Sequence, residues 1–163
     1  MGEGNVGKTS LIHRFVKGTY DTNYKATIGV DIFKKTVEHA DLTVDLQIWD
    51  LGGQSIFLSV RKKFYKHVKG AILVFDLTMP SSFKQLSSWV NELLQSGDRI
   101  PIILLGNKVD VIALKAIDET EVKKWMENQP LIDYYFPTSA LSGYNVEPAF
   151  KKLCEVLIEK NKE

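Results

Sequence analysis

Apolar residues in the first third of the chain follow two different periods. Residues 11, 12, 15 and 16 are apolar at helical spacing behind a glycine-rich turn, which predicts a helix over 9–17. Residues 30–38 and 42–49 form two β-prone runs, and in the second run apolar and polar side chains alternate. Because only residues 39–41 join the two runs, we expect an antiparallel hairpin here.

The rest of the chain alternates continuously apolar runs with amphipathic stretches. The apolar runs cover residues 71–75, 102–105 and 134–136, and the helical patterns cover 81–95, 118–128 and the residues from 146 onwards. Such an order predicts an α/β fold with a parallel sheet covered on both faces. Cys154 falls on the apolar stripe of the last helix, where we expect an inert core thiol. No repeat or linker divides the chain, so residues 1–163 are expected to form one domain.

Composition and charge exclude several classes of protein. The 163 residues are enough for one domain with its own core. With 21 basic and 20 acidic residues the net charge is +1, which favours neither nucleic acid nor an anionic membrane as a partner. The single cysteine excludes an intramolecular disulfide and fits a cytoplasmic location. No apolar run approaches the roughly 20 residues that a membrane span needs.

Residues 2–9, Gly-Glu-Gly-Asn-Val-Gly-Lys-Thr, carry the pattern of a phosphate-binding loop. Glycines let backbone N–H groups wrap around a phosphate, and the N-terminus of the following helix adds a favourable dipole. Lys8 is expected to reach the β- and γ-phosphates, and the Thr9 hydroxyl to bind Mg²⁺. A chance glycine-rich turn before a helix is the alternative. The expected nucleotide contacts are Gly2, Gly4, Asn5, Val6, Gly7, Lys8, Thr9 and Ser10.

Asn107-Lys108-Val109-Asp110 follows the apolar run 102–105, at the end of a strand where open α/β sheets bind ligands. A carboxylate at Asp110 can accept hydrogen bonds from both N1–H and the exocyclic amine of guanine, whereas adenine offers no such pair of donors. Asn107 is expected to bond the opposite edge of the ring. If it stood alone, the segment would be better interpreted as a polar turn. Together with the phosphate loop it predicts guanine.

Asp50-Leu51-Gly52-Gly53-Gln54 closes the second hairpin strand. A carboxylate at Asp50 suits Mg²⁺, Gly53 can bring its N–H close to a γ-phosphate, and Gln54 can orient a water for in-line attack. Thr27, just before the first hairpin strand, offers a further hydroxyl for the metal. By itself a glycine pair after a strand is more often only a turn. The expected metal ligands are Thr9, Thr27 and Asp50, and the expected catalytic residues are Gln54, Lys8 and Thr27.

These motifs resemble those of the Ras superfamily of small GTPases, and most closely its Rab branch. Besides the phosphate loop, the resemblance rests on Thr-Ile-Gly-Val-Asp at 27–31, Trp-Asp-Leu-Gly-Gly-Gln at 49–54, Gly-Asn-Lys-Val-Asp at 106–110 and Thr-Ser-Ala at 138–140. It implies a P-loop NTPase fold: a mostly parallel six-stranded sheet with one antiparallel hairpin strand, and about five helices on both faces. The implied function is a GTP/GDP switch that needs Mg²⁺ and hydrolyses GTP slowly without an activating protein.

The resemblance also implies roles that spacing alone does not. Tyr20 would stack on the guanine, and Ser139, Ala140 and Leu141 would form its last binding loop. Residues near 19–31 and 51–66 would be switch segments that bind effector, exchange and GTPase-activating proteins. Their implied surface includes Ile28, Val30, Phe33, Trp49, Phe64 and Tyr65, each of which is equally a candidate core residue. We expect a monomer without a nucleic-acid partner, cytoplasmic or peripheral on membranes through a lipidated tail outside this chain.

The chain departs from the family pattern in several places. Leu141 stands where the family usually has lysine, Gly52 replaces the usual alanine or threonine, and Ser55 replaces glutamate. Gly2 opens the phosphate loop with only Met1 before it, although the family carries a central strand that ends at this loop. We therefore expect Met1 to be the last residue of a first strand that is otherwise absent from this sequence.

Two other functions are compatible with these residues. One is a non-catalytic guanine-nucleotide-bound interaction module, including a domain of a larger protein. The other is an ATP-using P-loop enzyme such as a kinase, which gives no reason for the pair Asn107 and Asp110.

Overall fold

The computed structural model describes residues 1–21, 27–40, 42–53, 58–95 and 99–161. In chain order its helices and strands are α1 Lys8–Lys17, β1 Val30–His39, β2 Leu42–Leu51, α2 Leu58–Tyr65, β3 Ala71–Asp76, α3 Pro80–Lys84, α4 Leu86–Leu94, β4 Ile102–Asn107, a 3₁₀ turn Ile112–Leu114, α5 Glu119–Met126, β5 Ile132–Pro137 and α6 Val146–Lys160. Every strand that the sequence predicts is present, in the predicted order.

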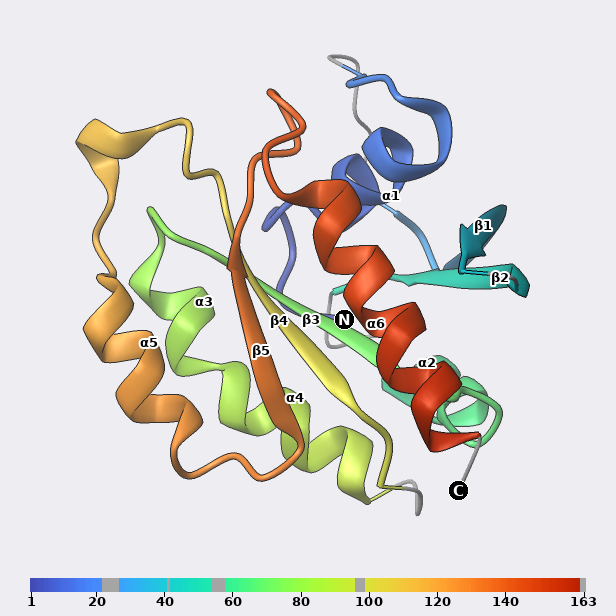
Figure 1. Ribbon diagram of the computed structural model, residues 1–163. Helices are drawn as coiled ribbons and strands as arrows, with labels where there is room; N and C mark the ends of the chain where they lie inside the picture. The colour runs from blue at the N-terminus through green and yellow to red at the C-terminus, as the bar shows by residue number, and fades with distance from the viewer. Residues whose placement is uncertain (22–26, 41, 54–57, 96–98, 162–163) are drawn as a thin grey trace.

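β3, β4 and β5 form the parallel sheet that the continuous apolar runs predict. Alternate residues of these strands face opposite sides, and helices cover both sides (Figure 1). Phe75 and Leu104 belong to a core with α3, α4 and α5, whereas Val74 and Ile103 belong to a second core with α1 and α6. All residues of β4 are buried, which explains why this strand has no polar face.

The hairpin forms a sheet of its own, which differs from the single six-stranded sheet that the resemblance implies. β1 pairs with β2 in antiparallel register, from Val30 opposite Leu51 to His39 opposite Leu42. Among the described residues no backbone pairing joins β2 to β3. A groove of about 500 Å³ separates them, lined mainly by β2, β3 and α6.

Met1 lies in this groove along the edge of β3. Its backbone nitrogen donates to the Ile72 carbonyl at 2.8 Å, and its own carbonyl accepts from the Val74 N–H at 2.9 Å. Met1 therefore has the strand-like position expected for it.

Two helices differ from expectation. The helix predicted over 81–95 is divided at Gln85 into α3 and α4, although Gln85 keeps helical dihedrals (φ −81°, ψ −8°). α2 has no counterpart in the sequence-based prediction. Its buried face carries Arg61 and Tyr65, which are four residues apart. Because an arginine occupies a core position, the apolar residues of this helix do not show a helical period in the sequence.

Cys154 on α6 is 1% exposed, so its predicted core position is confirmed. Within the ranges that the structure describes, no helix has the length and apolar character required to cross a membrane.

Candidate nucleotide and magnesium site

Two glycines of the phosphate loop, Gly2 and Gly7, lie where a side chain does not fit. Gly7 caps α1 with φ +96°, and a Cβ there would lie 2.3 Å from Nδ2 of Asn107. Gly2 has φ +133°, and a Cβ there would lie 2.2 Å from the carbonyl oxygen of Val74. A Cβ on Gly4 would meet nothing within 4 Å. The loop thus packs closely on β3 and β4 and stays open on the other side, at the N-terminus of α1, where helices bind anions.

Lys8, the first residue of α1, turns its side chain back over the loop. Its Nζ donates to the carbonyl oxygens of Gly2 at 2.9 Å and Glu3 at 2.6 Å. Burial lowers the pKa of Lys8 from 10.5 to about 8, and the negative charges of Asp50 and Glu3 oppose this effect. A phosphate beside the ammonium would favour its charged form. Ser10, half-buried in the same first helical turn, follows on α1.

Three oxygen-bearing side chains converge close to Lys8. The hydroxyls of Thr9 and Thr27 lie 2.7 Å apart, and both contact Oδ2 of Asp50, that of Thr27 at 3.2 Å. Asp50 is 1% exposed, and its buried Oδ1 has no hydrogen-bond partner among the residues that the structure describes. Such an oxygen is costly to leave unpaired, and Mg²⁺ prefers carboxylate and hydroxyl oxygens. The three expected metal ligands are therefore brought together, and their chemistry fits Mg²⁺.

Asn107 joins the phosphate loop to the loops that follow β4 and β5, which lie at one end of the sheet (Figure 1). Its Nδ2 donates to the Val6 carbonyl at 2.9 Å. Its Oδ1 accepts from the Thr138 hydroxyl at 3.3 Å and from the Ala140 N–H at 3.2 Å. The sequence predicted a contact of Asn107 with the base. The structure adds that the buried amide connects the three loops around the site.

Asp110 is exposed, and its carboxylate has no hydrogen-bond or ion-pair partner among the described residues. It is therefore free to accept from two donors of a purine edge. Lys108, with φ +69°, forms an ion pair of 2.6 Å with Asp76 at the end of β3. Sequence reasoning missed Asp76, although a lone acidic residue directly after an apolar strand was a usable signal.

The remaining predicted contacts differ in how far they are buried. Ser139 is fully buried, and its Oγ accepts from the Ser142 N–H at 3.0 Å, whereas Leu141 is 54% exposed. Tyr20, just beyond α1, is 39% exposed. Asn5 has φ +63° in the phosphate loop.

Gly53 lies against the phosphate loop, because a Cβ there would be 2.6 Å from the backbone nitrogen of Gly4. Gln54, the predicted water-orienting residue, lies outside the described residues.

Comparison with known proteins agrees with this geometry. The model of the Ras family matches residues 1–159. The chain belongs to the Ras family. It is 39% identical to Ras-related protein Rab7 of Drosophila melanogaster, over all of this chain and 80% of that protein. Ras-related protein Rab-32D of Dictyostelium discoideum is 34% identical, with 74% of its length covered, and Ras-related protein Rab7 of Cenchrus ciliaris is 38% identical, with 82% covered. The resemblance to Rab-like small GTPases is thereby confirmed.

In this Ras-family chain α2 belongs to the segment expected to act as the second switch, and it contains a buried ion pair. Arg61 donates from Nε and Nη2 to the two carboxylate oxygens of Glu92 on α4, at 2.9 and 3.0 Å. A third bond runs from Nη1 to the Gly52 carbonyl at 3.0 Å, and the Tyr65 hydroxyl also donates to Glu92. The guanidinium lies over the ring of Trp89, 4.5 Å from its centroid.

The same Trp89 extends this network to the phosphate loop, since its Nε1 donates to Oε1 of Glu3 at 3.2 Å. Sequence reasoning identified neither Glu92 nor Trp89. The partners lie 31 and 86 residues apart in the chain, and no local pattern connects them.

The switch surface implied by the resemblance to small GTPases loses one of its candidate residues. Ile28 is 83% exposed, and Val30 and Phe33 are half-buried. Trp49 and Phe64 form an edge-to-face pair with centroids 4.9 Å apart. Tyr65 is only 3% exposed because its ring packs in the core and its hydroxyl binds Glu92, so of the two places left open for it the core position holds and Tyr65 is not part of this surface.

Proposed function

We propose that this chain is a GTP/GDP switch that binds guanine nucleotide with Mg²⁺ and hydrolyses GTP slowly by itself. The observation that carries the proposal is the convergence of the Thr9 and Thr27 hydroxyls on Asp50, whose buried Oδ1 has no partner within the described part of the chain. Membership of the Ras family, whose members are GTP hydrolases, supports it.

The phosphate end of the nucleotide would lie at the N-terminus of α1. Backbone N–H groups of the open loop bind its oxygens, and the Lys8 ammonium leaves the carbonyls of Gly2 and Glu3 for the phosphates. Thr9, Thr27 and Asp50 would bind Mg²⁺, which when bound neutralises charge on the phosphates. The N–H of Gly53 reaches the γ-phosphate, and Gln54 orients the attacking water.

The base would lie between the loops joined by Asn107. The free carboxylate of Asp110 accepts from N1–H and the amine of guanine. The Ala140 N–H, which donates to Oδ1 of Asn107 in this structure, would turn to the oxygen on C6 of the base. Tyr20 covers one side of the ring. Lys108, Ser139 and Leu141 complete the walls of the pocket.

The chain is proposed to depend on an activating protein for fast turnover. Arg61 is buried against Glu92, and Arg14 donates to backbone carbonyls far from the phosphate end, so neither is available to the γ-phosphate. Following the Rab resemblance, we propose a role in signalling or membrane traffic, with effector and exchange proteins bound at the switch surface around Ile28 and Trp49 and a peripheral membrane location.

Nucleotide extraction tests the binding part of the proposal. Purified protein is denatured, and the released nucleotide is identified by chromatography. GDP or GTP is expected, because Asp110 selects guanine. Recovery of ADP alone would favour an ATP-using enzyme instead.

A single-turnover assay with GTP, with Mg²⁺ or with EDTA, tests the catalytic part. Gln54→Leu should suppress phosphate release and keep GTP binding, whereas Gln95→Leu, the same change at an exposed position on the far end of α4, should leave the rate unchanged. Tight GTP binding without phosphate release from the wild-type chain would identify a non-catalytic module.

A further inference from the structure

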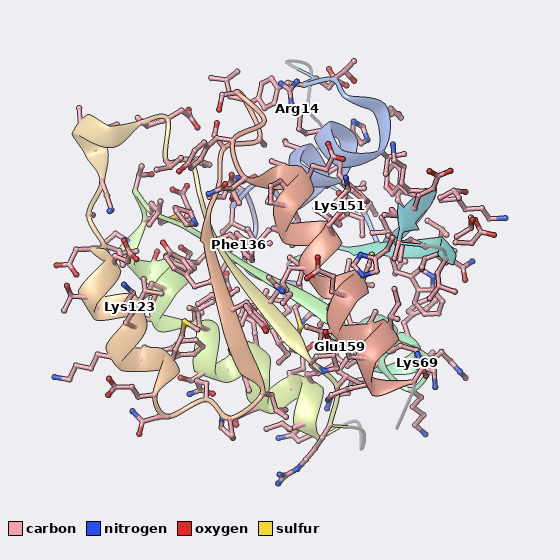
Figure 2. The ribbon with its side chains drawn as sticks, in the orientation of Figure 1. Arg14, Lys69, Lys123, Phe136, Lys151 and Glu159 are labelled. Carbon is pink, nitrogen blue, oxygen red and sulfur yellow. The ribbon has the colours of Figure 1, made fainter. Side chains whose placement is uncertain are left out.

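Arg14 lies on α1 next to the loop between β5 and α6, as its label in Figure 2 shows. Its Nε donates to the Ala140 carbonyl at 2.9 Å, and its Nη2 donates to the Leu141 carbonyl. Its Nη1 donates to the Gly18 carbonyl at 2.9 Å. All three acceptors are backbone oxygens, and in the described ranges Arg14 forms no ion pair.

One of these bonds has an ordinary explanation. Basic side chains in the last turn of a helix commonly bind its terminal carbonyls, and the bond to Gly18, which caps α1, is of this kind. The bonds to Ala140 and Leu141 are different, because these residues lie 126 and 127 positions further along the chain. Gly143, in the same loop with φ +86°, lies beside the Arg14 stem, since a Cβ there would be 3.4 Å from Cδ of Arg14.

The two loop residues that Arg14 binds are those expected to meet the base. The Ala140 N–H donates to Oδ1 of Asn107, the side chain expected at the base, and the carbonyl of the same residue accepts from Arg14. The guanidinium is planar and rigid, so its N–H donors can hold two successive carbonyls in one geometry. A lysine ammonium on its flexible stem does not fix them in this way. Leu141 brings no cation of its own to the base, so recognition by this loop depends on where its backbone lies.

We propose that Arg14 is a positioning residue for guanine recognition, which fixes the loop at residues 138–141 so that the Ala140 N–H meets the oxygen on C6 of the base. This inference rests on the proposed guanine-nucleotide function. Arg14 touches no part of the nucleotide. It acts through the peptide units of Ala140 and Leu141.

Two GDP analogues separate this role from a general loosening of the pocket. 6-Thio-GDP keeps N1–H and the amine but replaces the oxygen on C6 by sulfur, a weaker acceptor, so the ratio of GDP to 6-thio-GDP affinity reports the contact with Ala140. IDP keeps that oxygen and N1–H but lacks the amine, so the ratio of GDP to IDP affinity reports the contact with Asp110. Affinities are measured by competition against a fluorescent GDP analogue in Mg²⁺.

Arg14→Met removes every donor and keeps the aliphatic stem. We expect GDP affinity to fall about tenfold, as for the loss of one well-placed hydrogen bond, with little change for 6-thio-GDP. The ratio of GDP to 6-thio-GDP affinity should therefore fall toward one, while the ratio of GDP to IDP affinity stays at the wild-type value. Arg14→Lys keeps the charge but not the planar guanidinium. Its ratio of GDP to 6-thio-GDP affinity should lie between those of the wild type and Arg14→Met. Arg99→Met is the matched control, because Arg99 is exposed and has no partner among the described residues.

Several outcomes would overturn the inference. An unchanged GDP to 6-thio-GDP ratio in Arg14→Met means that the loop does not depend on Arg14. A parallel fall of both ratios means that Arg14 only supports the pocket as a whole. If Arg14→Met does not fold, Arg14→Lys decides between the same two results. If the wild-type chain binds no guanine nucleotide, the proposed function itself has failed, and this is a separate observation from any effect of Arg14.

Discussion

The ion pair between α2 and α4 allows a quantitative test of what stabilises the second switch segment. Glu92 accepts two hydrogen bonds from Arg61 and one from Tyr65, and the side chains of the pair are only 15% and 3% exposed. Glu92→Ala removes both acceptor oxygens, and with them all three hydrogen bonds. It leaves a buried guanidinium without its counter-charge, a change that typically costs about 3–5 kcal/mol of unfolding free energy.

That cost is large compared with the roughly 5–15 kcal/mol by which domains are usually stable. For a domain of this size about 1 kcal/mol corresponds to roughly 2–4 °C, so Tm should fall by about 10 °C. The penalty comes from the unpaired charge. Arg61→Met combined with Glu92→Leu, which removes both charges and keeps apolar volume, should therefore be clearly more stable than Glu92→Ala alone.

Urea unfolding followed by circular dichroism, at a fixed nucleotide and Mg²⁺ concentration, measures these differences. Glu119→Ala is the matched control, because Glu119 pairs with Lys123 on the exposed face of α5, and it should leave the midpoint unchanged. The reasoning fails if Glu92→Ala shifts the midpoint no more than this control. It also fails if the double variant is as unstable as Glu92→Ala.

Three further variants or reactions test other parts of the structure. Asp110→Asn should exchange guanine preference for xanthine, because an amide accepts from N1–H and donates to the oxygen on C2; competition with XDP measures this, and no gain in XDP affinity would contradict it. Gly7→Ala should lower stability by about 1–3 kcal/mol, since its Cβ would lie 2.3 Å from Asn107 at φ +96°, whereas Gly4→Ala meets nothing within 4 Å and should not. Burial raises the pKa of the Cys154 thiol, so it should resist iodoacetamide at pH 8 in the folded chain and react after unfolding; fast reaction of the native protein would refute the buried assignment. The same shift means that this group's contribution to stability is present below the ordinary thiol pKa and is lost as the pH rises above it.

The strands and most helices were predictable because their apolar periods are local. β3 and β4 are continuously apolar over 71–75 and 102–105, as is typical of strands buried on both faces, and α6 has a clear stripe that includes Phe150 and Cys154. The meeting of the loops at Asn107 and Ala140 was predictable from the same pattern. These loops lie directly after β4 and β5, and parallel strands bring their carboxyl ends to one edge of the sheet.

The parts that could not be predicted depend on contacts between distant residues. Arginine is rarely buried, so nothing in the sequence of α2 indicated that Arg61 would pair with Glu92 inside the core. For Asn107 the sequence indicated a contact with the base. Its bond to Val6 had no signal in the sequence, because the two residues are 101 positions apart.

These distant contacts reach the phosphate loop from two sides, and variants can test each side separately. Asn107 binds Val6 from the base pocket, whereas Trp89 and the Arg61 pair reach Glu3 from the second switch segment. A variant on the switch side, such as Glu92→Ala, should therefore change the release rate of nucleotides with any base by one common factor. Arg14→Met should instead change the discrimination between bases. If Glu92→Ala altered the ratio of GDP to 6-thio-GDP affinity, the two networks would be coupled through the loop, and Arg14 could not be assigned to base recognition alone.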